Sequence, residues 1–275
     1  MNTIIEYEQY IRPGVFIALL VLLGIAEFLA PLAKRRESHL HQWFTNLAMV
    51  TIDNIILKLL FPLLAVGVAN YARENGIGLF NIINLPEMII IVLSVLLLDL
   101  LIYGQHVMMH QMPILWRLHR MHHSELGLNV TSAVRFHPIE IIISMLIKML
   151  FVLIMGIPVV AVIIFEVILN GLALFNHSNI KLPSPVEKIL RTTFITPEIH
   201  WIHHSEIVSE TNSNYGFNLC FWDKIFGTYI DKPTLNCEQM RQGLTEFGFE
   251  KPLNLIELLA SPFKNYPQPK SKKKT

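Results

Sequence analysis

The chain has 275 residues, of which 52% are hydrophobic and only 16% charged, and its formal net charge is +1. Soluble domains carry about 25% charged residues, so the composition excludes an ordinary soluble domain and is typical of a membrane protein. The near-zero net charge identifies no partner, and we expect no nucleic acid to bind.

A short polar segment, residues 1–13, precedes a first expected transmembrane span at about 14–33. Basic residues at 34–36 follow it, and by the positive-inside rule they place this end in the cytoplasm. Two histidines come next, His39 and His41, and we interpret them as loop residues near the lipid headgroups rather than as metal ligands.

Two further spans, at about 45–70 and 87–105, complete a membrane region that we expect to cover 14–105. Asp99 lies seven residues before His106, so a helix would place both on one face. The carboxylate could then orient a metal-binding imidazole through its second ring nitrogen. An ordinary hydrogen bond between helices is an equal alternative.

The next apolar run, residues 139–175, is 37 residues long. As one helix it would extend about 55 Å at ~1.5 Å per residue, but the hydrocarbon core is only ~30 Å thick. We therefore predict a hairpin within 139–176, broken near 156–158. Pro138 and Glu140 are typical of a helix start. Glu166 is either a functional group in the membrane or a structural partner for another helix.

Histidines are concentrated in three clusters between residues 106 and 204. The clusters are His106-x3-His110, His119-x2-His122-His123 and His200-x2-His203-His204. Imidazole is the commonest side-chain metal ligand. In a helix, the histidines of the first cluster share one face, and we expect the same of the second cluster. Eight imidazoles are too many for one tetrahedral ion, so the sequence predicts two metal ions.

The motifs of other metalloenzymes help to select the metal. The sequence has no HExxH motif and no pair of Glu-x-x-His motifs, which excludes a zincin-type protease and a carboxylate-bridged di-iron bundle. Eight to ten neutral imidazoles at the membrane edge favour a redox metal that activates oxygen, although zinc stays open. A metal transporter or sensor is the alternative; it would need ligands near the mid-membrane and inverted repeats, which are not visible.

The three clusters resemble the histidine boxes of the fatty acid hydroxylase / sterol desaturase superfamily, over roughly residues 85–230. Three further segments agree with this resemblance: Phe136-His137-Pro138, Phe175-x-His177-Ser178 and Asn218-x3-Trp222-Asp223. Members of the superfamily are integral membrane di-iron enzymes of the endoplasmic reticulum or the bacterial inner membrane. They use O2 and an external electron donor to hydroxylate, desaturate or demethylate lipids.

The resemblance implies two iron ions as cofactors and O2 as co-substrate. The implied ligands are His106, His110, His119, His122, His123, His137, His177, His200, His203 and His204. Three residues, Asn218, Trp222 and Asp223, are implied to support the third box, and we add Asp99 to these supporting residues. Because the chain contains no cytochrome b5-like haem domain, we expect a separate electron donor of ferredoxin, cytochrome b5 or reductase type.

We therefore predict an all-α, polytopic membrane protein with four to five transmembrane or hairpin helices and a cytoplasmic, histidine-rich di-metal cap. The catalytic region would be 106–230 and the cytoplasmic tail 231–275. The expected reaction is O2-dependent hydroxylation of an unactivated C–H bond in a membrane lipid, with desaturation as the alternative. The compact chain favours the bacterial inner membrane over the endoplasmic reticulum.

Overall fold

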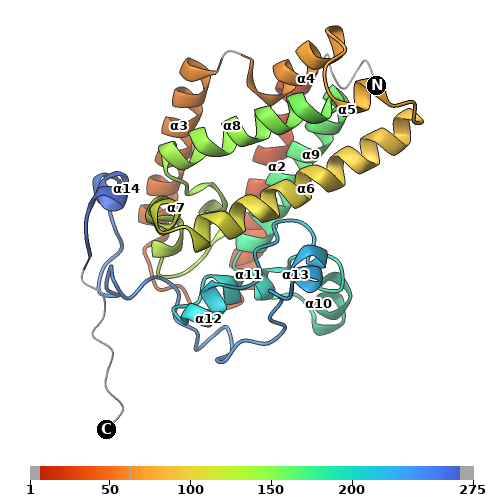
Figure 1. Ribbon diagram of the computed structural model, residues 1–275. Coiled ribbons are helices and arrows are strands. Elements are labelled where there is room, and N and C mark those ends of the chain that lie inside the picture. The colour runs from red at the N-terminus through yellow and green to blue at the C-terminus, as the bar shows by residue number, and fades with distance from the viewer. Residues whose placement is uncertain (1–6, 62, 267–275) are drawn as a thin grey trace.

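The computed structural model describes residues 7–61 and 63–266, and within these residues it contains helices, three isolated bridges and no strand. The long helices are α2 (Glu8–Leu29), α3 (His39–Leu60), α6 (Glu87–Gln111), α8 (Pro138–Met155) and α9 (Val159–His177). Figure 1 shows them on one side of the molecule, with the short helices between residues 184 and 226 gathered at the other end. The predicted all-α architecture is confirmed.

Five segments are long and apolar enough to cross a membrane. Four of them are α2, α6, α8 and α9, and the fifth runs from His39 to Ile82 across residue 62. Their number agrees with the expected four to five spans, and the protein is a polytopic membrane protein.

The second span differs from the single helix expected at 45–70. Helix α3 ends at Leu60, and α4 (Leu64–Glu74) and α5 (Leu79–Ile82) follow as separate pieces. Leu64, the first residue of α4, has a φ of 49°, a left-handed conformation that costs a leucine conformational energy and interrupts regular helix geometry between α3 and α4. The sequence also has a proline at position 62, which cannot donate a helical hydrogen bond.

The hairpin between α8 and α9 is confirmed at the predicted break. Gly156 follows α8 with a φ of 65°, as expected of a glycine that ends a helix. A Cβ at this position would lie 2.8 Å from the Asn81 side-chain amide and 2.9 Å from the Ile77 carbonyl oxygen. Both the backbone conformation and the close approach of the 77–81 segment therefore require glycine.

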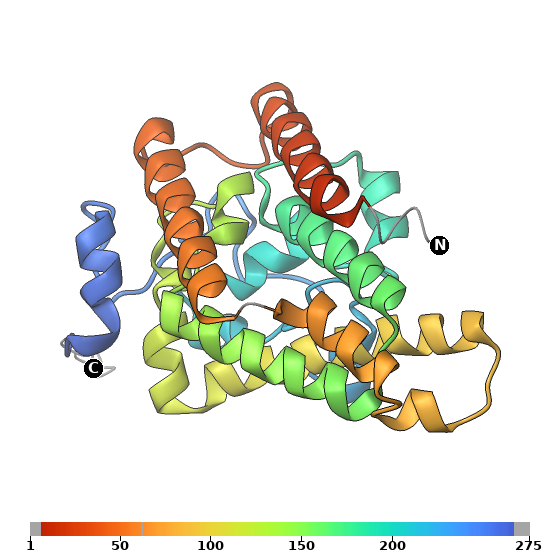
Figure 2. The same ribbon diagram turned by 90° about the horizontal axis from the view of Figure 1, so that it is seen from above.

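Helix α9 is central to the bundle and packs against α2, α4 and α6. The run from Val159 to Ile163 is buried, as are Phe165 and Leu174, so the first half of this helix is enclosed by its neighbours. Figure 2, which looks from above, shows α9 between α2 and α4, with α8 on the other side of α4. This packing brings the histidine end of α9 towards the short helices.

The short elements form a cap at the end of the bundle where α6 and α9 deliver their histidines (Figure 1). They are α7 (Pro113–His119), η1 (His122–Ser124), η2 (Val130–Val134), α10 (Ser184–Leu190), α11 (Pro197–His203), α12 (Val208–Thr211) and α13 (Phe221–Phe226). Helix α14 (Leu255–Ala260) and η3 (Ser261–Phe263) pack beside α3 and α7.

Candidate metal centre

Nine histidines meet at the base of the cap in two adjacent groups. The first group is His106, His110, His119, His123 and His203, and the second is His122, His177, His200 and His204. In each group one ring nitrogen per residue lies within 4.8 Å of the others. The groups touch each other: the rings of His123 and His204 stack with centroids 4.3 Å apart.

Regular helix geometry accounts for the first cluster of the sequence. Helix α6 continues past the expected span end at residue 105 as far as Gln111, so His106 and His110 lie one turn apart on the same helix. Their rings are 5.0 Å apart, and both reach the first group, as the i, i+4 spacing predicts.

The expectation that the second cluster shares one face is wrong. Helix α7 ends at His119, and the chain continues into the 3-10 turn of η1. His119 and His123 join the first group, whereas His122 joins the second. The third cluster divides in the same way, since His203 reaches the first group while His200 and His204 reach the second. Each of these clusters therefore contributes to both groups.

The distances between the histidine nitrogens suit shared binding to a metal ion better than hydrogen bonding between the rings. Close Nε2 pairs are 3.2 Å apart for His106–His119, 3.1 Å for His122–His177 and 3.0 Å for His177–His200. Both ring nitrogens of His110 and His123 are buried without a hydrogen-bond partner among the described residues. Two ligands at ~2.0–2.1 Å from one ion lie at most about 4.2 Å apart. Slight contraction of each group would therefore accommodate an ion.

Backbone carbonyls orient three of the rings through short hydrogen bonds. The Nδ1–H groups of His106, His203 and His177 donate to the carbonyl oxygens of Tyr215, Ser213 and Ala173, at 2.7, 2.7 and 2.8 Å. A donor on Nδ1 leaves the Nε2 lone pair free for a metal, which fixes the useful tautomer. No motif in the sequence indicated the 213–215 loop in this role.

A carboxylate orients a fourth ring, and it is one that the sequence did not single out. Glu140 Oε1 lies 2.7 Å from His119 Nδ1, and both side chains are buried. Glu140 was interpreted only as helix-start chemistry, and it does lie in the first turn of α8. The same residue therefore complements the helix dipole and positions a histidine of the first group.

Asp99 does not contact a histidine. Its two carboxylate oxygens accept hydrogen bonds from Asn218 Nδ2 and Trp222 Nε1, both at 2.8 Å. The orienting role proposed for Asp99 is therefore replaced by the alternative, a hydrogen bond between elements. Asp99, Asn218 and Trp222 instead join α6 to the segment that carries α13.

Asp223 positions His106 indirectly, through the backbone of Tyr215. Its carboxylate accepts from the backbone amides of Tyr215 and Gly216, at 2.8 and 2.9 Å, and from the Thr228 hydroxyl at 2.6 Å. The Tyr215 carbonyl is the one that receives the His106 Nδ1–H. Asp223 thus holds the loop that orients His106, and burial raises the pKa of its carboxyl.

His137 lies outside both groups, although the resemblance implied it as a ligand. Its Nδ1 accepts the backbone N–H of Ile139 at 3.2 Å and so caps α8, and its Nε2 contacts the Leu259 carbonyl at 3.2 Å. With both nitrogens engaged, we leave it out of the ligand set. His39 and His41 also lie outside both groups, as expected, but they belong to the first turn of α3 rather than to a loop.

Arg135 braces the segment that carries the second cluster. Its buried guanidinium donates to the Ser124 hydroxyl at 2.9 Å, the Asn46 side-chain oxygen at 3.1 Å and the Met121 carbonyl at 3.3 Å. The Arg135 carbonyl also lies 3.2 Å from His122 Nδ1. A long cationic side chain is thereby used to fix the irregular backbone around His122 and His123.

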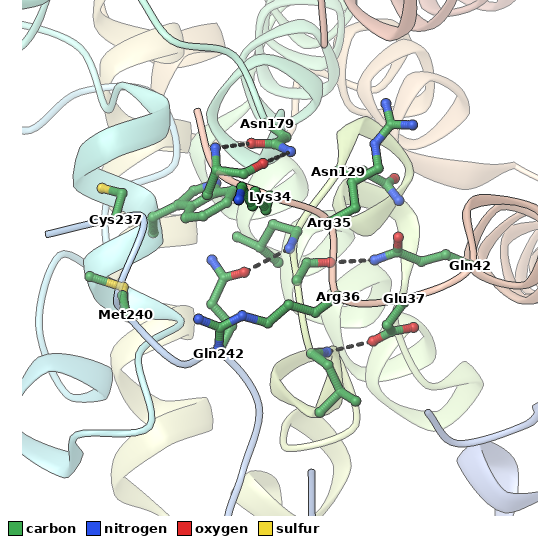
Figure 3. A pocket seen from close by; sticks show the side chains of 15 residues that line it. Lys34, Arg35, Arg36, Glu37, Gln42, Asn129, Asn179, Cys237, Met240 and Gln242 are labelled. Carbon is green, nitrogen blue, oxygen red and sulfur yellow. Dashed lines mark hydrogen bonds between the residues drawn. The ribbon is translucent and has the colours of Figure 1, made fainter. Parts of the chain in front are cut away.

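The connection between α2 and α3 ties the cap to the bundle, as Figure 3 shows. Glu37 accepts from the Leu126 amide at 2.5 Å, Gln242 accepts from the Leu128 amide at 2.8 Å, and Asn179 accepts from the Ala33 amide at 2.9 Å. The pocket there has a volume of about 20 Å³, enough for roughly one water, and no histidine lines it. It is a structural junction.

Burial keeps the cap histidines neutral. It lowers the pKa of His122, His123, His200 and His204 well below the usual value, with neighbouring imidazoles adding to the effect. It also lowers the pKa of His203 to about 3. Neutral imidazole is the form that binds a metal, so the site holds its ligands ready.

A cavity of about 280 Å³ adjoins the first group within the bundle. His106 and His119 line it, together with apolar side chains such as Leu57, Met145 and Leu169. A cavity that combines apolar and polar side chains and is lined by two candidate metal ligands suits an amphipathic substrate.

Comparison with known proteins finds relatives that are named as hydroxylases and monooxygenases. The ornithine lipid hydroxylase OlsE of Rhizobium tropici is 29% identical over 176 residues, which cover 63% of this chain and 50% of the relative. Alkylglycerol monooxygenase of Xenopus tropicalis is 31% identical over 157 residues, covering 56% of this chain and 32% of the relative, and the human enzyme is 29% identical over the same length. The chain thus spans about half of the first relative and about a third of the others.

No solved structure matches the chain. The family model described as fatty acid hydroxylase matches residues 91–228, half of the sequence, and this range contains both histidine groups. The chain belongs to the fatty acid hydroxylase family.

Proposed function

We propose that this protein is a di-iron, O2-dependent lipid hydroxylase. The observation that carries the proposal is the position of two buried histidine groups against a cavity inside a bundle of membrane-spanning helices. The first group would hold one iron ion and the second group the other, because imidazole suits iron and each group has nitrogens without a partner. The relatives are named as enzymes that act on lipids, and this supports a lipid substrate.

The proposed reaction converts an unactivated C–H bond, O2, two electrons and two protons into an alcohol and water. When bound, the two iron ions supply the redox chemistry that O2 reduction requires. The chain orients three of the nine imidazoles, those of His119, His106 and His203, through Glu140 and the carbonyls of the 213–215 loop. It also excludes water, since none of the nine side chains is more than 8% exposed.

The electrons would come from a separate protein of ferredoxin, cytochrome b5 or reductase type. Basic residues at 34–36 follow the first span and favour a cytoplasmic location for the cap and the C-terminus. We propose the bacterial inner membrane as the location, with the endoplasmic reticulum as its counterpart in a eukaryote.

Metal content of the detergent-purified chain tests the ligand set. We expect about two irons per chain, from the two groups, and about one after His122→Ala. His41→Ala is the matched control, because the His41 side chain hydrogen-bonds to the Leu253 carbonyl among the described residues and lies outside both groups. Tight zinc with no iron and no redox response would contradict the proposal.

The reaction itself is tested with ¹⁸O2, a reductant and a membrane lipid extract. A hydroxylated lipid that carries ¹⁸O is the expected product. An alkene without the label would identify a desaturase instead, because desaturation releases both oxygen atoms as water.

A further inference from the structure

The cavity beside the first group is not lined by apolar side chains alone. Its apolar wall also includes ionisable side chains from four of the long helices: Arg12, Asp53, Glu140, Lys148 and Glu166. Charged groups at membrane depth are costly and usually serve a substrate or ion. These charged side chains therefore indicate which chemical groups the cavity binds.

The cations of the cavity are already neutralised. Glu166 pairs with Lys148 Nζ at 3.0 Å and with the Arg12 guanidinium, which also pairs with Glu8 at 3.0 Å. Lys148 lies eight residues beyond Glu140 on α8, about 12 Å further along the helix at ~1.5 Å per residue. This balanced ion cluster thus occupies the end of the cavity away from the histidines.

The groups near the histidines have the opposite character, an excess of hydrogen-bond acceptors. Asp53 is 4% exposed and makes no hydrogen bond or ion pair with another described residue. Glu140 uses Oε1 for His119 and leaves Oε2 without a partner. Gln105 donates its amide to Ser144 at 2.5 Å, which leaves its buried carbonyl oxygen unpaired.

Within residues 7–61 and 63–266, no protein donor serves these three acceptors. Asp53 and Glu140 are both acidic, and both line the same cavity as His106 and His119. Buried polar atoms without a partner are costly, and carboxylates are the costliest. A ligand that brings donors and positive charge would satisfy all three side chains.

We propose that the cavity binds its lipid through a positively charged, hydrogen-bond-donating amine seated against Asp53 and Glu140. This inference rests on the proposed lipid hydroxylase function and specifies the substrate class. The amine would lie beside His106 and His119, so the oxidised carbon belongs to the polar head of the lipid, a few bonds from the nitrogen, rather than to the end of an acyl chain.

Equilibrium binding to the full chain in detergent, without O2 or reductant, tests the inference. The probes are N-dodecanoyl-1,2-diaminoethane, which has one free amine, and its N-acetylated form, which has none. We expect the free amine to bind at least about tenfold more tightly, in the range of close charge pairs. Asp53→Asn should abolish the preference, while Asp231→Asn, a carboxylate in an exposed part of the cap, should keep it.

Equal binding of the two probes by the unsubstituted protein overturns the inference, and this measurement does not depend on whether Asp53→Asn folds. A preference that survives in folded Asp53→Asn also overturns it. Failure of the proposed function is a separate result: a chain that holds no iron can still discriminate between the probes. Conversely, an active hydroxylase that binds both probes equally retains its function and refutes the amine site.

Discussion

The contact between Glu140 and His119 is the sharpest test of how this site is built. The carboxylate lies 2.7 Å from Nδ1, and the two side chains are 4% and 1% exposed. Glu140→Ala would leave the buried Nδ1–H without an acceptor and free the ring to turn. Loss of such an outer partner costs about 10–100-fold in metal affinity, equivalent to about 1.4–2.7 kcal/mol.

The assay is a competitive metal titration of the purified variant against a chelator, with thermal melting to verify the fold. Glu140→Gln retains an acceptor oxygen and should lose less affinity than Glu140→Ala. Glu187→Gln is the control for loss of a buried carboxylate, because Glu187 binds the Thr196 hydroxyl and no histidine. Metal affinity of folded Glu140→Ala within about twofold of the unsubstituted protein would refute the orienting role.

Two further predictions concern histidines with different roles. His137→Ala should leave the metal content unchanged and lower the stability by about 1 kcal/mol, because it removes the N-cap of α8; loss of a metal ion on elemental analysis would contradict this. Acidification should destabilise the metal-free protein. Burial lowers the pKa of cap histidines such as His122 and His203, so below about pH 6.5 the unfolded chain binds protons that the folded chain cannot. Each such group costs about 1.4 kcal/mol per pH unit from there down to its folded pKa. Chemical unfolding between pH 7.5 and 5.5 checks the slope, and a flat profile would show that these histidines are already accessible to protons.

The amino-acid sequence by itself determined the fold class and indicated most of the histidines that meet in the two groups. The apolar runs are too long and too poor in charge for any other class of protein, and the hairpin break at Gly156 follows from the thickness of the membrane. Eight clustered imidazoles indicated two metal ions without any coordinates. The pair His106 and His110 was predictable in detail, because regular helix geometry places residues four apart on one face.

Only the tertiary structure decided which histidine joins which group. His122 and His123 are adjacent but diverge, because the chain leaves the α-helix after His119 and periodicity no longer applies. The orienting groups were also invisible in the sequence. Backbone carbonyls, such as that of Tyr215, have no residue signature, and Glu140 reaches His119 only because α8 packs against α7. Hydrogen bonds between distant segments depend on packing, which local sequence patterns do not encode.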